Sequence, residues 1–249
     1  MIPVEKRWVM NRKVFNRILK MIAKSRLEAL LPEMRSELIS YSKGSDTTGT
    51  QPITLFLAVK DILKYRPRRI VECGTGSSTV VLALAVQKLK NEDPSYDGKI
   101  ISMESVEEWY KIAQSTLPDK FKNIVTIVHG PREKYEVSMF RGYIHSNQPD
   151  EEYDFVFLDG PNFEDEYGTA FCADVIHVAQ KKRKGKLRGV IDGRGSSAFV
   201  IQTLFGRFST RYFMSMMASR FCIDCGRNFK IQRTTDFKAG FLGVLRLGR

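Results

Sequence analysis

The sequence predicts a single α/β domain built around a mostly parallel sheet, and three observations lead to this prediction. Short apolar runs alternate with segments of helical length along most of the chain, as in a parallel sheet with right-handed crossovers. One run, residues 69–73, passes through a turn with two glycines into the apolar segment 80–86, which is the pattern of a buried strand, a tight turn and a helix. Polar side chains, several of them acidic, directly follow the apolar runs. Because such sheets bind ligands at the carboxyl ends of their strands, we expect the functional site there.

Five strands are predicted in this alternation, and two more close the chain. The five are residues 69–73, 99–104, 124–128, 153–158 and 189–191. The helices expected with them include one opened by Pro52 and those over residues 106–116, 165–181 and 197–205. Residues 132–151 are interpreted as a helix with a loop. Two further strands are expected near residues 212–216 and 240–247, with no helix between them, so the predicted sheet has seven strands.

The first 50 residues precede this alternation and predict a helical extension. Residues 5–31 fit an amphipathic helix whose apolar stripe is flanked by basic side chains. The stripe consists of Val14, Phe15, Ile18, Leu19 and Ile22. Pro32 suits the first turn of a second helix. A basic amphipathic helix can lie on a membrane or on nucleic acid, but we favour packing over the sheet edge, or a lid. We therefore expect an extension or lid over residues 1–50 and the main domain over 51–249.

Composition narrows the class of protein. The chain has 249 residues, of which 43% are hydrophobic, enough for one domain with a substantial core. No apolar run is long enough to cross a bilayer, and the charged first residues are unlike a secretory signal. Four cysteines in a chain of this length favour reduced thiols and a cytoplasmic location over a disulfide framework. The net charge of +12 fits an anionic partner or substrate, and equally a solvated basic surface.

The turn after residues 69–73 is the most informative stretch. Gly74 and Gly76 allow unusual backbone dihedrals and a close approach by a ligand. Three small hydroxyl residues, which can cap the next helix, follow them. They are Ser77, Ser78 and Thr79. A dinucleotide-binding turn would carry glycine or alanine at the position of Thr79.

The run Glu72-Cys73-Gly74-Thr75-Gly76-Ser77-Ser78 resembles motif I of the class I S-adenosylmethionine-dependent methyltransferases. The resemblance implies a Rossmann-like sheet that ends in an antiparallel hairpin, which fits the two closing strands. It implies S-adenosyl-L-methionine as cofactor, with Glu72 orienting the methionine end and the glycine turn beneath the sugar and amino acid. The cofactor-binding residues then expected are Glu72, Gly74, Thr75, Gly76, Ser77, Ser78, Thr79, Glu104, Ser105, His129 and Gly130.

Two of these expectations concern the next strand ends. Glu104 ends the strand at 99–104, where a carboxylate can accept both hydroxyls of a ribose. The alternative is that Glu104 caps the following helix together with Ser105. At the third strand, many methyltransferases carry an acid near the adenine, but this chain has His129 and Gly130; either they serve the adenine or the histidine only fills space.

Asp159 follows the fourth strand, in a context that resembles motif IV of the small-molecule O-methyltransferases. The resemblance implies that Asp159 is the catalytic residue, either as general base or as ligand of a divalent metal such as Mg²⁺. Asp192, after the fifth strand, is the counterpart of the second metal ligand, although the family's usual Asn after it is replaced by Gly193. Both aspartates also suit plain turn and capping roles.

The acceptor is expected to be a small polar molecule with a hydroxyl group. In small-molecule methyltransferases the segment before motif I often lies over the methionine end and the substrate, so the resemblance implies such contacts for Thr48, Thr50 and Gln51; the alternative is that they only cap the helix opened by Pro52. The basic surface and Arg194 suggest an anionic acceptor. Two alternatives remain: an NAD(P)-dependent oxidoreductase, for which no catalytic Tyr-x-x-x-Lys element is visible, and a basic RNA-binding methyltransferase. Cys222 and Cys225 have metal-ligand spacing but no second pair, so they are expected to be loop thiols rather than zinc ligands.

Overall fold

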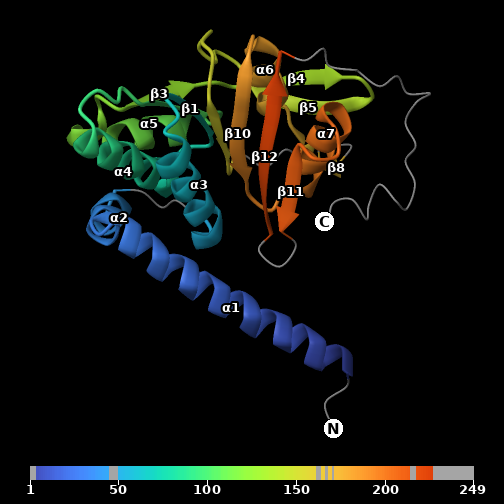
Figure 1. The fold of residues 1–249 in the computed structure, drawn as a ribbon, viewed down its shortest axis with the longest axis horizontal. Helices are drawn as coiled ribbons and strands as arrows, with labels where there is room; N and C mark the ends of the chain where they lie inside the picture. Colours follow the sequence, from blue (N-terminus) through green and yellow to red (C-terminus); the bar gives the residue numbers. More distant parts are fainter. Residues whose placement is uncertain are drawn as a thin grey trace.

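The computed structural model of the chain describes residues 4–44, 50–160, 164–165, 168–169, 171–213 and 217–226. Its centre is a seven-stranded sheet with strand order β11-β12-β10-β6-β1-β2-β3 (Figure 1). Those strands are β11 (Thr210–Phe213), β12 (Ala218–Cys225), β10 (Gly185–Ile191), β6 (Phe155–Leu158), β1 (Arg69–Cys73), β2 (Lys99–Glu104) and β3 (Val125–His129). Neighbours from β10 to β3 are parallel, whereas β12 is antiparallel to both β10 and β11. The predicted fold class, a mostly parallel seven-stranded sheet closed by an antiparallel pair, is confirmed.

Helices cover both faces of this sheet because its central strands are apolar on both sides. On one face, Ile70 and Phe155 pack in a core with α3 (Pro52–Tyr65) and α4 (Ser77–Glu92). On the other, Val71 and Val156 pack with α6 (Asp174–Lys181) and α7 (Gly195–Phe205). The remaining helical segments near the sheet are α5 (Glu107–Thr116) and the short η1 (Asp119–Phe121).

The interpretation of residues 132–151 as a helix with a loop is wrong. This segment is a hairpin of β4 (Arg132–Val137) and β5 (Phe140–His145), which joins β9 (Phe171–Cys172) in a separate three-stranded sheet. Most side chains of β4 are exposed, so no apolar alternation marks it as a strand. The next predicted helix also starts later than expected, at Asp174. Two short strands, β7 (Glu164–Asp165) and β8 (Gly168–Thr169), pair before it.

The closing pair has a different second strand from the one predicted. The segment 240–247 lies outside the described residues, and the strand that pairs with β11 is β12. Cys222 and Cys225 therefore lie on a strand rather than in a loop. Their burial alternates, Cys222 being exposed and Cys225 buried, as the period of a strand requires.

Two helices precede α3, namely α1 (Val4–Leu30) and α2 (Met34–Ser42). Ala23 and Leu27 bury one side of α1 in the core that contains α3 and α4. Figure 1 shows the rest of α1 running outward as a long rod below the sheet. The apolar stripe predicted to cover the sheet edge is largely exposed instead, with Val14, Phe15 and Ile18 each about half accessible.

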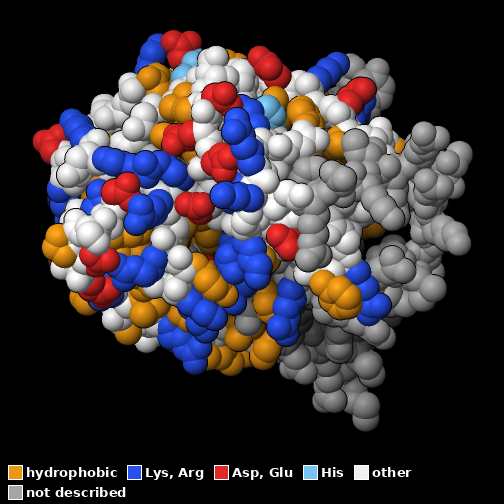
Figure 2. Space-filling view, turned by 45° about the horizontal axis from the view of Figure 1, so that its top comes forward, with side chains coloured by type: hydrophobic (Ala, Val, Ile, Leu, Met, Phe, Trp, Pro, Cys, Tyr) orange, Lys and Arg blue, Asp and Glu red, His pale blue; other side chains and the backbone are white. Residues whose placement is uncertain are grey.

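Charge is spread over the surface visible in Figure 2, where Lys and Arg side chains alternate with acidic ones rather than forming one basic block. None of the helices within the described ranges combines the length and apolar character needed to cross a membrane.

Candidate functional site

The glycine turn between β1 and α4 lies at the carboxyl edge of the sheet. Gly74 has a φ of 95°, in the region that favours glycine, and its N–H donates to the carbonyl of Met103 at 2.8 Å. A Cβ at Gly74 would lie only 2.8 Å from the Cα of Gly160. The turn is therefore packed backbone to backbone on the loop that follows β6. Glycine is required here by the fold itself, whether or not a ligand also approaches.

Glu72 lies fully buried beneath this turn. Its Oε2 accepts hydrogen bonds from the Ser102 hydroxyl at 2.6 Å and from the Thr79 hydroxyl at 2.7 Å. Its Oε1 is also buried and has no hydrogen-bond partner in the described part of the chain. Burial raises the pKa of Glu72 to about 7 against the opposing effect of the Ser102, Ser78 and Thr79 hydroxyls, and the negative charge of Asp159 adds to the increase. A buried carboxylate with one free oxygen is suited to a cationic or N–H-bearing ligand.

Thr79 explains why this turn carries no third glycine. Its Oγ1 accepts the N–H of Gly76 at 3.1 Å while it donates to Glu72, so one hydroxyl ties the turn to the buried acid. The residue before the first turn of α4 is Gly76, which has no side chain with which to cap the helix. Ser77 and Ser78 are already helical residues of α4. Of the three predicted capping residues, Ser77 and Ser78 thus only form the helix start, whereas Thr79 also caps it by accepting the N–H of Gly76.

Glu104 is buried at the end of β2 and bonds to the glycine turn. Its Oε2 accepts the Thr75 hydroxyl at 2.9 Å and the Thr75 N–H at 3.3 Å. Its Oε1 accepts the N–H of Val106 at 3.0 Å, immediately before α5. Glu104 thus holds the backbone just before α5, although no side-chain hydrogen bond caps that helix, and the same carboxylate reaches the turn. Ser105, half-buried beside Glu104, provides none of these bonds.

His129 and Gly130 continue the same edge at the end of β3. The His129 ring lies 5.4 Å from the ring of Tyr110 on α5, and the Gly130 N–H donates to the Glu104 carbonyl at 2.8 Å. A Cβ at Gly130 would lie 2.3 Å from the Ser146 carbonyl oxygen. Gly130 is thus another position of close backbone packing, and the rings of His129 and Tyr110 supply a half-buried aromatic surface near Glu104.

Asp159 and Asp192 form a second group at this edge, after β6 and β10. The hydroxyl of Thr50 donates to Asp159 Oδ2. Arg194 binds both aspartates, with Nη2 3.2 Å from the Asp159 carbonyl oxygen and Nε 2.9 Å from Asp192 Oδ1. The sequence-predicted residues Thr50, Asp159, Asp192 and Arg194 are therefore brought together. Gln51 lies next to them as the residue that precedes α3.

The two aspartates influence each other's protonation. Burial raises the pKa of Asp159 to about 7, with the Thr50 hydrogen bond opposing the increase and the charge of Asp192 adding to it. The pKa of Asp192 is also raised, chiefly by burial, and Arg194 opposes that change. Two close carboxyl groups cannot easily ionise together. The nearby charge of one aspartate therefore favours the protonated form of the other.

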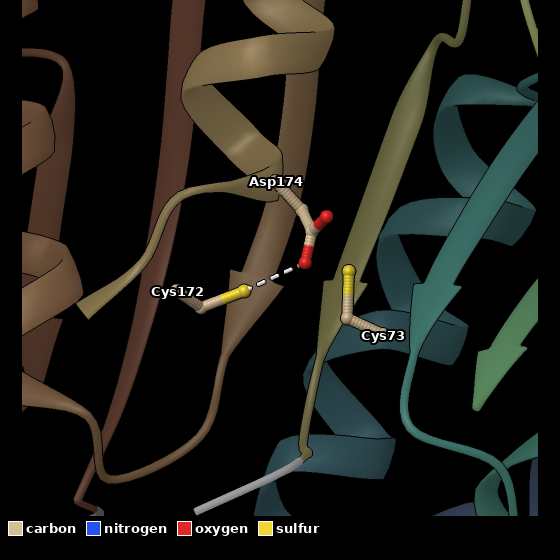
Figure 3. Close-up of side chains that lie close together, drawn as sticks. All are labelled: Cys73, Cys172 and Asp174. Carbon is tan, nitrogen blue, oxygen red and sulfur yellow. Dashed lines mark hydrogen bonds between the residues drawn. The ribbon is translucent and has the colours of Figure 1, made fainter. Parts of the chain in front are cut away.

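A third polar cluster, which sequence reasoning did not find, lies on the other face of β1 (Figure 3). Asp174 lies at the start of α6. Its Oδ1 accepts a hydrogen bond from the backbone N–H of His145 at 2.9 Å, and its Oδ2 lies 2.8 Å from Nδ1 of the His145 ring. The Cys172 thiol donates to the same Oδ2 at 3.0 Å, and Cys73 points toward this pair. These residues come from three segments far apart in the chain, with only Cys172 and Asp174 close in sequence, so no local spacing marks the whole cluster.

The sulfur atoms and carboxylate of Cys73, Cys172 and Asp174 are close enough to hold a metal ion. However, both oxygens of Asp174 are already used by His145 and Cys172. The hydrogen bond to Cys172 and burial raise the pKa of Cys73 far above its usual value, and burial raises that of Cys172 to about 11. Protonated, buried thiols are unreactive and poor ligands. This cluster is interpreted as part of the core.

Comparisons with known proteins find no family model and no curated protein that matches this chain. Solved structures with a similar arrangement are found. The chain is similar to the O-methyltransferase TomG from Streptomyces achromogenes, solved in complex with S-adenosylmethionine, at 16% identity over 82% of this chain and 96% of that chain, with a TM-score of 0.48. A putative class I S-adenosylmethionine-dependent methyltransferase from Listeria monocytogenes is similar at 11% identity over 83% of this chain and 70% of that one, with a TM-score of 0.47.

A third similar structure is the methyltransferase PaMTH1 from Podospora anserina, solved with S-adenosylhomocysteine bound. Its identity is 13% and its TM-score 0.41, and the match covers 70% of this chain and 65% of that one. At identities this low, structural similarity shows a shared fold and says nothing about activity. The function therefore has to be argued from the residues of the site.

Proposed function

We propose that this chain is an S-adenosylmethionine-dependent methyltransferase that acts on a small, polar, hydroxyl-bearing acceptor. The observation that carries the proposal is the buried carboxylate of Glu72, with one oxygen lacking a partner, directly beneath a glycine turn and beside the carboxylate of Glu104. When bound, S-adenosylmethionine supplies an electrophilic methyl group on its sulfonium. The residues of this chain have to hold the donor, align the acceptor and take up the acceptor's proton.

The donor half of the site consists of the turn and the ends of β1 to β3. Glu104 already accepts a hydroxyl from Thr75, which is the same type of donor as the hydroxyls of a ribose. The free Oε1 of Glu72 suits an ammonium group such as that of the methionine end. His129 and Tyr110 offer ring faces near Glu104 for a flat base. The three groups would thus contact the ribose, the ammonium group and the base of one cofactor.

The acceptor half consists of Asp159 with Thr50, Asp192 and Arg194. Asp159 takes the proton from the acceptor hydroxyl, and its raised pKa of about 7 makes it a base matched to neutral pH. Arg194 holds the loop by its contact with the Asp159 carbonyl and neutralises Asp192. A guanidinium here also favours an acceptor with a negative charge. Thr50 belongs to the segment before α3, so the end of the N-terminal extension contributes directly to this half.

The pair of aspartates does not fit a divalent metal well. The cation already beside Asp192 is Arg194, and the hydroxyl of Thr50 already donates to Oδ2 of Asp159. We therefore derive no step through Mg²⁺ and assign Asp159 as a general base without metal.

The first test measures donor binding by calorimetry with S-adenosylmethionine, S-adenosylhomocysteine and NAD. Glu104→Ala is expected to weaken donor affinity at least about tenfold, because each hydrogen bond to a charged group contributes about 1.5–3 kcal/mol. Glu108→Ala removes an exposed acid from the first turn of α5, four residues further along the chain, and serves as the matched control with unchanged affinity. Binding of NAD in place of the two sulfur compounds would instead support the oxidoreductase. Gly74 is unsuitable for this test, because a side chain there meets Gly160 and disturbs the fold.

The second test addresses Asp159, using labelled methyl donor and a panel of hydroxyl acceptors. Asp159→Asn is expected to lower the rate of methyl transfer by about 10²–10⁴-fold, the usual contribution of a general base, while donor affinity stays within a factor of about two. In the wild-type protein the rate is expected to rise with pH through about 7, as Asp159 loses its proton. A chelator should leave the rate unchanged. Loss of activity with the chelator and its return with Mg²⁺ would show that the pair binds metal after all.

A further inference from the structure

The outer part of α1 carries an apolar strip that nothing in the described structure covers. Its members are large hydrophobic side chains with between 44% and 67% of their surface accessible. They are Val14, Phe15, Ile18, Met21 and Ile22. At about 100° per residue they fall within roughly 120° of the helix circumference. The side of α1 that packs on the domain is a different one, marked by Ala23 and Leu27. The apolar strip therefore lies on a different side of α1 from the face that packs on the domain.

Basic residues line one border of this strip. Arg17, Lys20 and Lys24 are all exposed, and on the same helical projection they follow one another next to Met21. Over residues 14–30 the only acidic residue is Glu28, which is half-buried. Within residues 14–30, the exposed part of α1 is thus apolar on one side and cationic beside it, with no exposed acid in the same stretch.

The apolar strip and its basic border together distinguish between the partners that could cover the exposed part of α1. A second copy of the chain, paired along the strip, would bring the basic borders of two helices together with few acids between them, which is unfavourable. A nucleic acid would engage the basic border through its phosphates but would leave the apolar strip exposed. An anionic lipid surface engages both, because acyl chains accept the apolar side chains and headgroups attract the lysines and arginine. We propose that α1 binds in the plane of an anionic lipid surface.

The position of α1 determines which part of the domain would face that surface. Arg26 of α1 lies over the ring of Phe56, in the first turns of α3, 5.9 Å from its centroid. The start of α3 is also where Thr50 reaches Asp159. In Figure 1, α1 runs past the lower side of the domain, where β11 ends and β12 begins. The end of β10 lies beside the start of β12, with Ile191 opposite Ser219, and Gly193 approaches Met217. The helix therefore lies toward the edge of the sheet that carries the candidate site, so a lipid surface bound by α1 would lie on that side.

The test is sedimentation of the full chain with large unilamellar vesicles of phosphatidylcholine alone or mixed with phosphatidylglycerol. We expect binding to the mixed vesicles that weakens as salt rises, and little binding to phosphatidylcholine alone. The double variant Phe15→Ser/Ile18→Ser should lower the affinity for mixed vesicles at least about tenfold. Lys20→Glu/Lys24→Glu should lower it by about the same factor or more. Since all four side chains are exposed, the helical content by circular dichroism should not change.

Two control variants repeat the same changes elsewhere. Phe208→Ser removes an aromatic ring that is 91% accessible, before β11. Lys184→Glu/Lys186→Glu reverses two exposed charges near the start of β10, at the end of that strand opposite the site. Both should bind vesicles like the wild type. The proposal is overturned if Phe15→Ser/Ile18→Ser binds as tightly as the wild type, or if both control variants weaken binding equally. It is also overturned if sedimentation velocity shows a dimer that Phe15→Ser/Ile18→Ser dissociates while vesicle binding stays unchanged.

Discussion

Two fully buried carboxylates lie on opposite faces of β1, and their surroundings differ. Glu72 lies beneath α4, with two hydroxyl groups as partners and one oxygen unpartnered. Asp174 lies at the start of α6, with both oxygens bound by His145 and one also by Cys172. Burial raises the pKa of Glu72 to about 7. Burial alone would raise the pKa of Asp174 too, but the charge and hydrogen bonds of His145 lower it below the usual value.

The difference distinguishes a structural acid from one available to a ligand. A buried carboxylate held by an imidazole is satisfied within the protein, so it stabilises the fold only as long as both partners remain. A buried carboxylate held by hydroxyls alone keeps a costly charge and an unused acceptor. We expect a ligand with an N–H or ammonium group to relieve that cost. The following variants test this comparison.

The largest effect on stability is expected for Asp174→Asn. The change leaves His145 without its charged partner in a fully buried position, and breaking one side of a buried pair costs about 3–5 kcal/mol. Because the pKa of Asp174 is lowered in the folded protein, its contribution is present above the unfolded pKa and is lost only as the pH falls through the lower, folded value. Urea denaturation at pH 8 should show the full loss. A free energy of unfolding within 1 kcal/mol of the wild type would contradict the structural role.

Glu72→Gln is expected to change the free energy of unfolding by less, and to raise it rather than lower it. The pKa of Glu72 is raised from 4.5 to about 7, so between these values the folded protein keeps a proton that the unfolded chain releases. The free energy of unfolding therefore falls as the pH rises through this window, by up to about 3 kcal/mol. Glutamine carries no such charge.

The measurement compares wild type and Glu72→Gln by denaturation at pH 5 and pH 8. The variant should gain stability relative to the wild type at pH 8, and it should lose affinity for S-adenosylmethionine. Asp174 does not contribute to the difference, because its lowered pKa lies below this range. An identical pH dependence in the two proteins would show that Glu72 does not titrate there.

The smallest effect is expected for Ser102→Ala. The hydroxyl of Ser102 donates to Glu72 at 2.6 Å, and a bond to a charged group contributes about 1.5 kcal/mol or somewhat more. The loss should appear at pH 8, where Glu72 is ionised, and shrink at pH 5, where it is protonated. Equal losses at both values would mean that Ser102 acts through packing rather than through the charge.

Much of the fold could be predicted because its strongest patterns are local. The strand at 69–73, the turn with Gly74 and Gly76, and the acid at the end of β2 all show in short stretches of sequence. Since the carboxyl ends of parallel strands meet at one edge, the proximity of Asp159 and Asp192 could be expected as well. The contact of Thr50 with Asp159 is more surprising, because 109 residues separate the two positions.

Other features could not be predicted because they depend on tertiary contacts. The pair of His145 and Asp174 joins a hairpin to a helix start, and neither residue has a motif around it. In β12 the alternation of buried Phe221, Ile223 and Cys225 was present in the sequence, but the spacing of the two cysteines drew the interpretation toward a loop. The exposed stripe on α1 was assigned to packing because amphipathic pattern alone does not say which surface covers it.

The contact between Gly74 and Gly160 limits how this protein could be re-engineered. Because each glycine would place a Cβ 2.8 Å from the Cα of the other, neither position tolerates a side chain while the other strand end stays in place. A designer who wishes to change acceptor preference can graft new residues after β6 only from position 161 onward. Recombination between relatives with different loops would succeed only when the crossover preserves both glycines, so the two turns are inherited as one unit.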